Sequence, residues 1–558
     1  MKKTILALGL VALATVVSCQ KEDPKPTSGL DFITEQVIDV ADANFATIEF
    51  NAYEAWTAEV VDADGEPVSD VILSAKSGVA GDAQKLKVTL PSLAEGETGR
   101  VVGVEFKYGN DVEIVFVIQG KAILIDAIDS EDGNIPAEAG DYTFAIISNC
   151  KFNTSADSDA SWFTAQVEQS VESKMAYTLT ATVEANDDYT LRHAWVKFTT
   201  SDIQVAVLDD NGTPTGETKD YETSLDIYQA GLATLAFSKS LAEYGVTTLS
   251  AAGAIHRLGT KDDKIVISDG TAFHVLDGDG AYVSGSASPV QDVLPEAMAV
   301  DAAGNMIFAA AGAYCGTFDI YLATDAADPA KFISYEHNSV YSNMVSNLRV
   351  YGDVTGDAVI TAHTDLYPYC VYWEVKAGVP GEAKLVELPS GANWDTWSGI
   401  IWNANRNGCV APLGTTADAG FLFIAYDAQY TLFFVDKDGN AQALFAYEEY
   451  FGEGAGSNVN FQSISVREWN GKIYAAVGIS TYFSWGGCPD VILLDVTDQE
   501  IVANFDHWNY DITCNYVGAN DGENASADVC LIPEDDQLGI VMIDGLNDVI
   551  YRINCPKK

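Results

Sequence analysis

The chain has 558 residues, of which 48% are hydrophobic, so it is long enough for more than one folded core. It carries 81 acidic residues against 30 basic ones, which gives a formal net charge of −51 at pH 7. A surface this acidic repels the phosphates of nucleic acids and of anionic lipids, so neither is an expected partner.

The first residues form a short targeting segment. Met1–Lys3 is basic, and the apolar run from 4 to 17 that follows is too short to cross a membrane comfortably. The run ends in Val-Val-Ser-Cys at 16–19, which resembles a bacterial lipobox. The resemblance implies a signal peptide over 1–18 and a lipid on Cys19. The alternative is an ordinary secretory signal with an incidental cysteine.

The next residues add a second targeting feature. Gln20–Pro24, QKEDP in one-letter code, resembles the surface-export signal of Bacteroidetes lipoproteins. Together these resemblances imply a protein of the outer membrane that faces the cell exterior and is anchored by its lipid without spanning the bilayer. Residues 19–30 are polar and contain prolines, so we expect them to form a tether.

Two stretches, 31–121 and 122–231, repeat a pattern of short alternating strands separated by Gly, Asp and Asn. Long helical periodicity is lacking in both, which is typical of β-sandwiches. Each stretch has a strand that bears a tryptophan, then an arginine (Arg100 or Arg192) that leads into another strand. Each ends in Gln-Gly or Gln-Ala-Gly.

These features resemble BACON domains, the small immunoglobulin-like modules of Bacteroidetes surface proteins. The second stretch matches better, through Ser161-Trp162-Phe163, Asn186, Arg192 and IYQAG at 227–231. The resemblance implies two immunoglobulin-like sandwiches that bind carbohydrate or, like many members of the family, act as spacers. We favour spacers, because a tryptophan in a small sandwich usually belongs to the core; the tryptophans in question are Trp56 and Trp162.

We interpret residues 232–254 as a connector with a short outer strand or a helical turn. Over 255–558, a unit of four short strands recurs with a period of roughly 45–60 residues. This repeat predicts a β-propeller of six blades, or of seven if the connector contributes to another blade. The fold class expected for the whole chain is therefore all-β.

Short polar turns within the repeat are predicted to be hairpins in which Gly and Asn supply positive φ. The turn Asp436–Asn440, DKDGN in one-letter code, resembles the start of a calcium-binding loop, but it lacks the distal glutamate that an EF-hand requires. We therefore predict a turn and no cofactor, with calcium as the alternative.

The other connections of a propeller emerge on the opposite face, and here they are rich in aromatic residues. Aromatic rings mixed with Asn, Asp, Gln and His suit sugars, because pyranose C–H faces stack on rings while amides and carboxylates bind hydroxyl groups. The alternative is that single rings fill gaps between blades. The candidate ligand-binding side chains are Tyr314, Tyr367, Tyr369, Trp394, Trp397, Tyr482, Trp485, Trp508 and Tyr510.

Catalytic and metal-binding motifs are not evident: the sequence has no HExxH, no GxSxG and no P-loop, and no CxxC among its nine cysteines. The first candidates for a catalytic group are His363, Asp365, His507 and Arg349. The eight cysteines after Cys19 are expected either to form one or more disulfides or to be buried free thiols.

The sequence thus predicts a surface lipoprotein whose propeller binds a polysaccharide or glycan, with other outer-membrane uptake proteins as further candidate partners. Two alternatives stay open, a protein-binding or adhesion module and a propeller glycoside hydrolase or polysaccharide lyase.

Overall fold

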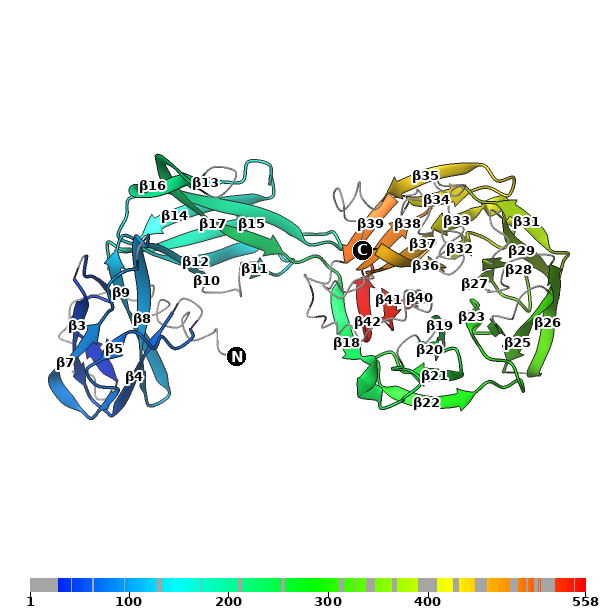
Figure 1. Cartoon of the computed structure of the whole chain (residues 1–558), viewed down its shortest axis with the longest axis horizontal. Helices are drawn as coiled ribbons and strands as arrows, with labels where there is room; N and C mark the ends of the chain where they lie inside the picture. Colours follow the sequence, from blue (N-terminus) through cyan, green and yellow to red (C-terminus); the bar gives the residue numbers. More distant parts are fainter. Residues whose placement is uncertain are drawn as a thin grey trace. The chain divides into compact units, whose positions relative to one another are not determined.

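The computed structural model describes two compact units, Met1–Asp187 with Leu191–Gly231, and Asp188–Thr190 with Leu232–Lys558 (Figure 1). The described residues are 29–558 without 42, 63–64, 95, 128–132, 172, 209–212, 252–255, 311–315, 326, 338–346, 364–368, 390–408, 425–430, 447–458, 482–489, 498–499, 506–509, 511, 513–526 and 546. They form an all-β chain in which two short 3₁₀ turns are the only helical elements described. The expected all-β class is confirmed.

The first unit begins with two sheets that enclose one core. One sheet has the order β1 (Leu30–Phe32), β3 (Phe45–Ala52), β7 (Gly81–Thr89), β5 (Ile72–Leu73). The other has the order β2 (Val37–Asp39), β9 (Asp111–Gly120), β8 (Gly99–Tyr108), β4 (Trp56–Val61), β6 (Ser77–Gly78). In both sheets every second side chain points inward, and these side chains pack together in the space between the sheets. There the ring of Trp56 lies edge-on to Phe50 at a centroid distance of 5.2 Å.

A second pair of sheets repeats this arrangement. One sheet has the order β10 (Ile123–Ala127), β12 (Gly140–Ser148), β15 (Ala176–Val183), β14 (Phe163–Gln169). The other has the order β11 (Asn134–Ile135), β17 (Pro214–Gln229), β16 (Arg192–Leu208), β13 (Asn153–Ala156). In both pairs the second strand runs parallel to the last, β2 beside β9 and β11 beside β17. The duplicated strand pattern thus forms two two-layer sandwiches.

The two expected core tryptophans pack as the sequence predicts. Trp56 is buried, and its indole N–H donates to Oε1 of Gln84 at 3.0 Å. Trp162 is partly buried against the second core, with the guanidinium of Arg192 4.2 Å from the centroid of its ring. The arginine that marks the repeat therefore covers the tryptophan of the second sandwich.

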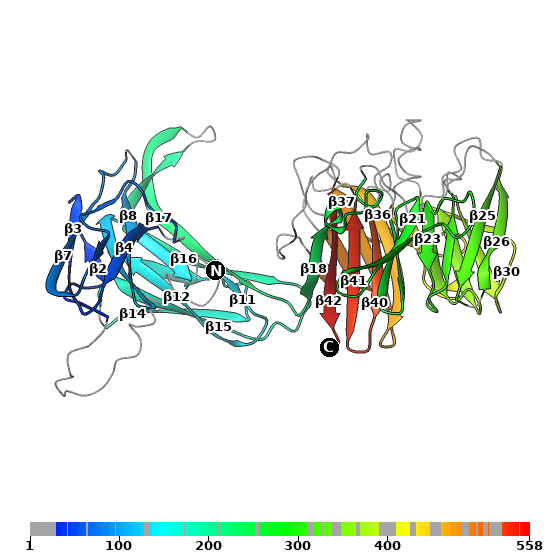
Figure 2. The same ribbon diagram turned by 90° about the horizontal axis from the view of Figure 1, so that it is seen from below.

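The described part of the second unit forms six antiparallel sheets, five with four strands and one with five, and Figure 2 shows their strands from the side. Five of the sheets are built from consecutive strands. The strands of all six sheets, from first to last, have the following bounds. Sheet one holds β19 (Arg257–Lys261), β20 (Lys264–Ser268), β21 (Ala272–Leu276) and β22 (Tyr282–Ala287). Sheet two holds β23 (Ala297–Val300), β24 (Met306–Ala309), β25 (Gly316–Thr324) and β26 (Ala327–His337). Sheet three holds β27 (Asn347–Gly352), β28 (Ala358–His363), β29 (Tyr369–Lys376) and β30 (Val379–Pro380), and β31 (Lys384–Glu387) also pairs with β29.

The remaining sheets follow the same plan. Sheet four holds β32 (Cys409–Pro412), β33 (Phe421–Ile424), β34 (Thr431–Val435) and β35 (Ala441–Ala446), with η2 (Ala417–Ala419) between its first two strands. Sheet five holds β36 (Val459–Trp469), β37 (Lys472–Thr481), β38 (Asp490–Asp495) and β39 (Glu500–Phe505). Sheet six holds β40 (Ala527–Pro533), β41 (Gln537–Asp544), β42 (Val549–Pro556) and, as its outer strand, β18 (Thr234–Ser240), which η1 (Leu241–Tyr244) follows.

The first strands of the six sheets contact one another in a closed cycle. β19 contacts β23, and the contacts continue through β27, β32 and β36 to β40, which returns to β19 (Figure 1). The segment 232–254 contains the short outer strand and the helical turn that the sequence suggests: Thr234–Ser240 pairs with β42 and completes sheet six, and η1 follows it. Three strands at the end of the chain need a fourth partner to cover their edge, and the start of the unit supplies it.

Candidate functional site

The connections between strands alternate between two ends of the six sheets, because successive strands run in opposite directions. Connections from first to second strand and from third to fourth lie at one end, which we call the hairpin end. The remaining connections lie at the other, which we call the loop end. Aromatic residues are absent from all the hairpin-end connections, for example Asp277–Ala281, Asp301–Asn305, Asp436–Asn440 and Asn470–Gly471.

Aspartates hold the hairpin end together. Oδ1 of Asp301 accepts hydrogen bonds from the backbone N–H groups of Ala303 at 2.9 Å and Asn305 at 2.8 Å. Its Oδ2 accepts from the N–H of Val354 in the next sheet at 2.8 Å, and the side-chain amide of Asn305 reaches Asp353 at 3.3 Å. These bonds fix neighbouring turns to each other, so this end is polar and firmly built.

The turn Asp436–Asn440, for which calcium is the alternative, belongs to the same group. Oδ1 of Asp436 accepts from the N–H groups of Asp438 and Asn440, both at 2.9 Å, and Lys437 pairs with Asp418 at 2.7 Å. In the part of the chain that is described, no group of three or more His, Cys, Asp or Glu side chains is placed to hold a metal ion.

Two of the aromatic candidates, Tyr369 and Tyr510, are described, and they lie beside or within loop-end connections. Tyr369 begins β29, directly after the connection 364–368, and its side chain is 38% exposed. Tyr510 is partly buried against the core cluster of sheets five and six, and burial raises the pKa of its hydroxyl far above the usual value. Tyr369 thus has the exposure that ligand stacking needs, whereas Tyr510 is at least partly a packing residue. The candidates outside the described residues are Tyr314, Tyr367, Trp394, Trp397, Tyr482, Trp485 and Trp508, together with the lipidation candidate Cys19.

Arginines line the axis of the ring, where the first strands meet. Arg349 on β27 is buried, donates to the carbonyl oxygens of Ile464 at 2.6 Å and Leu348 at 2.9 Å, and forms an ion pair with buried Asp528 on β40. Oδ2 of Asp528 also accepts the backbone N–H of Leu258 on β19 at 2.8 Å. One carboxylate therefore ties three first strands together.

Arg349 is a catalytic candidate from the sequence, but its hydrogen bonds and its ion pair give it a structural role. The side chain of His363 and the residues Asp365 and His507 lie outside what the structure describes. The sequence does hold a signal for the axis of the ring. Arg257, Arg349 and Arg467 occur on the first strands of three different repeats.

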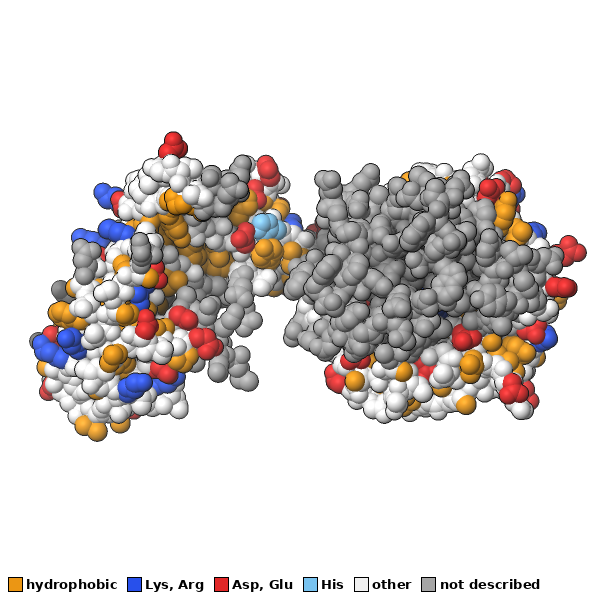
Figure 3. Space-filling view, in the orientation of Figure 1, with side chains coloured by type: hydrophobic (Ala, Val, Ile, Leu, Met, Phe, Trp, Pro, Cys, Tyr) orange, Lys and Arg blue, Asp and Glu red, His pale blue; other side chains and the backbone are white. Residues whose placement is uncertain are grey.

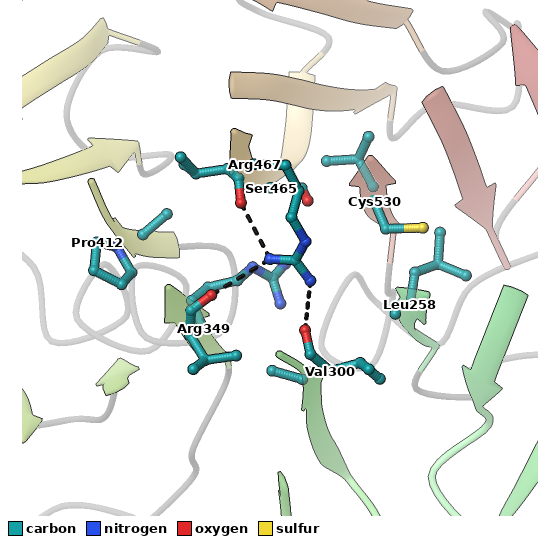
Figure 4. Close-up of a pocket in the computed structure, with 13 residues that line it drawn as sticks. Leu258, Val300, Arg349, Pro412, Ser465, Arg467 and Cys530 are labelled. Atoms are coloured by element: carbon teal, nitrogen blue, oxygen red, sulfur yellow. Dashed lines mark hydrogen bonds between the residues drawn. The ribbon is translucent and has the colours of Figure 1, made fainter. Parts of the chain in front are cut away.

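Arg467 on β36 completes this set beside a small cavity of about 20 Å³ (Figure 4). Its Nη1 donates to the carbonyl oxygen of Val466 at 3.1 Å and more weakly to that of Val350 at 3.5 Å, and its Nη2 donates to that of Val300 at 2.5 Å. The guanidinium therefore bridges β36 to β27 and β23.

Two further titratable groups lie buried in sheet one and just before it. His256 is fully buried, and one ring nitrogen lies 2.7 Å from the carbonyl oxygen of Leu249. Burial lowers the pKa of His256 to about 4. Burial alone would raise the pKa of Asp269, but hydrogen bonds from His274, Thr248 and Thr271 outweigh it and hold that pKa well below its usual range.

We expect His256 to make the second unit acid-sensitive between pH 6.5 and 4. The unfolded chain takes up a proton near pH 6.5 and the folded chain only near pH 4, so the free energy of unfolding falls across this window by roughly 3 kcal/mol. The stabilisation from Asp269 is lost only below about pH 4. His256→Gln should flatten the dependence of melting temperature on pH in this window, while His193→Gln at an exposed histidine should leave it unchanged. An equally steep dependence in His256→Gln would contradict the assignment.

The cysteines, the helices and the acidic surface residues that are described add no further candidate site. The cysteines described, Cys150, Cys370, Cys409, Cys530 and Cys555, are all buried free thiols, one of the two expected outcomes. Among the described residues no helix is long and apolar enough to cross a membrane. On the described part of the face in Figure 3, acidic side chains are scattered over both units without a single dominant cluster.

Comparisons with known proteins identify only a domain and distant structural likenesses. Residues 279–547 match a domain of unknown function, DUF8500, which covers most of the six-sheet unit. No curated protein matches the chain. Among solved structures, a titin substructure covers 36% of this chain and 98% of its own length at 8% identity and a TM-score of 0.15. Human protocadherin-24 EC1-2 covers 36% and 98% at 7% identity and a TM-score of 0.13.

Proposed function

We propose that the second unit is a six-bladed β-propeller that binds a polysaccharide or glycan through aromatic side chains at its loop end. In this proposal the chain is an outer-membrane lipoprotein anchored through Cys19. The two sandwiches are immunoglobulin-like modules of the BACON type that act as spacers. The cyclic contacts among the six first strands support the propeller, because a ring of radially arranged four-stranded sheets is the plan of that fold.

One observation carries the binding proposal, namely the contrast between the two ends of the ring. The hairpin-end connections contain no aromatic residue, whereas the loop-end connections 390–408 and 482–489 each contain three. If aromatic residues only filled gaps between sheets, they would not need to gather in the connections of one end. Rings held at one end, with Asn, Asp and Gln among them, suit the alternating apolar and hydroxyl faces of a sugar.

We expect Trp397→Ala and Trp485→Ala each to weaken glycan binding by about 10-fold or more, because each removes a stacking ring. Affinity electrophoresis of the full chain against a panel of polysaccharides measures this, and detection of new reducing ends shows whether the sugar is cleaved. The control is Leu385→Ala, which removes an exposed apolar side chain from β31.

The outcomes separate the alternatives. If both tryptophan variants bind glycan as well as the unaltered protein, the binding site is not at the loop end. If both variants unfold, the two tryptophan rings belong to the hydrophobic core. Release of sugar product makes the protein an enzyme, and binding to no polysaccharide favours a protein ligand.

A further inference from the structure

Among the described residues of the first strands, three arginines and one aspartate lie at the axis of the second unit. They are Arg257, Arg349 and Arg467, with Asp528. Asp528 forms its ion pair with Arg349 and accepts two backbone N–H groups as well. The oxygens of the Asp528 carboxylate therefore accept hydrogen bonds from Arg349 and from two backbone N–H groups, and from no atom of Arg467.

Arg467 is the group left without a carboxylate. Its hydrogen bonds all go to backbone carbonyl oxygens, and its Nε donates to no described residue. None of the described acidic side chains lies within ion-pair distance of it. A guanidinium has five N–H donors, so donors remain after these bonds are counted.

Neighbouring groups do not provide the missing negative charge. Burial raises the pKa of Cys530 to about 12, so its thiol stays protonated, and burial also raises the pKa of Tyr351. Asp301 acts on Arg467 only from a distance. Arg467 is partly exposed and keeps part of its hydration, but no described carboxylate replaces the part that packing removes.

The space beside Arg467 limits what could compensate this charge. The cavity of about 20 Å³ is lined by Arg349, Arg467, Ser465 and Cys530, with apolar side chains around them (Figure 4). This volume holds a particle the size of one water molecule. A phosphate, a sulfate or a carboxylic acid is larger than this volume and would have to extend out of it.

We propose that this axial cavity binds a single halide-sized monovalent anion, such as chloride, between the guanidinium groups of Arg467 and Arg349. The anion neutralises the excess charge and accepts the spare N–H donors. The net charge of −51 does not prevent this, because surface charges beyond about 8–10 Å are screened by salt, whereas the two guanidinium groups line the cavity itself.

Melting of the full chain at constant ionic strength tests the proposal, with chloride replaced stepwise by gluconate, an anion too large for the cavity. The second unit should melt a few degrees higher in chloride, with a saturating dependence, because a ligand that binds only the folded state stabilises it. Constant ionic strength keeps the screening of the acidic surface the same in both salts.

Matched variants locate the effect. Arg467→Met removes the charge while keeping much of the side-chain volume, and should abolish the difference between the two salts. Arg100→Met is the control, because Arg100 pairs with Asp70 and Glu97 at the surface of the first unit, and the difference should persist.

Crystals of the unaltered protein in bromide provide a readout that does not depend on a variant folding. An anomalous peak in the cavity beside Arg467 is expected. Equal melting in chloride and gluconate, or bromide peaks confined to the protein surface, would overturn the proposal and leave water as the occupant.

Discussion

Replacing Asp528 with alanine lowers the free energy of unfolding of the second unit by about 3–5 kcal/mol. The carboxylate is fully buried, pairs with Arg349, and accepts the N–H groups of Leu258 and Val529 at 2.8 and 2.9 Å. Its removal leaves a buried guanidinium without its partner and two backbone donors unbonded. Calorimetry of the full chain should show the transition of the second unit shifted to lower temperature.

Two comparisons make this result specific. Asp418→Ala removes the partner of Lys437 in an exposed pair, and it should lower the stability of the second unit far less, because solvent screens such a pair. Arg349→Met combined with Asp528→Leu replaces the buried pair with apolar side chains and should recover much of the loss. If Asp528→Ala costs no more than Asp418→Ala, the axis does not depend on this pair.

The second large effect is expected at the strand that closes the ring. Phe237 on β18 is 8% exposed and packs in the core that sheets one and six share. Its ring lies so close to Gly280 that a Cβ there would come within 2.7 Å. Phe237→Ala should therefore destabilise the second unit by about 3–5 kcal/mol and expose the chain around β18 to proteases.

The control for this prediction lies in the same strand. Thr234 is exposed and pairs with Asn554 only through the backbone register, so Thr234→Ala should change stability by less than about 0.5 kcal/mol. Equal proteolysis of the two variants would show that packing of Phe237 is not what holds β18 in place.

The repeat and its turns could be predicted from the sequence because both are local features. Strand alternation and a turn such as Asn470–Gly471, where φ is 54° and 76°, depend on residues a few positions apart. The duplication of the sandwiches is visible for the same reason. Trp56 and Trp162 could be assigned to cores from composition alone.

The axis and the ring closure could not be predicted because both depend on contacts between distant segments. Nothing near Arg349 in the sequence points to Asp528, so sequence alone leaves this arginine open to a catalytic interpretation. A short outer strand could be suggested within 232–254, but its partner β42 could not, because 308 residues separate Ser240 from Asp548. The ligand-binding assignments stay predictions: Tyr369 is exposed, Tyr510 is partly packed, and the other candidates lie outside the described residues.

The pairing of β18 with β42 also sets an order of events for the chain as it is made. The hydroxyl of Ser240 donates to the carboxylate of Asp548, 308 residues further on, so sheet six cannot form until β42 has been made. Until then β18 is an unpaired edge, and the contacts that close the ring are among the slowest to form. A chain that stops short of β42 would leave β18 without its partner strand. Synthesis through β42 is thus a condition for sheet six to form, whereas the sandwiches need only residues up to 231.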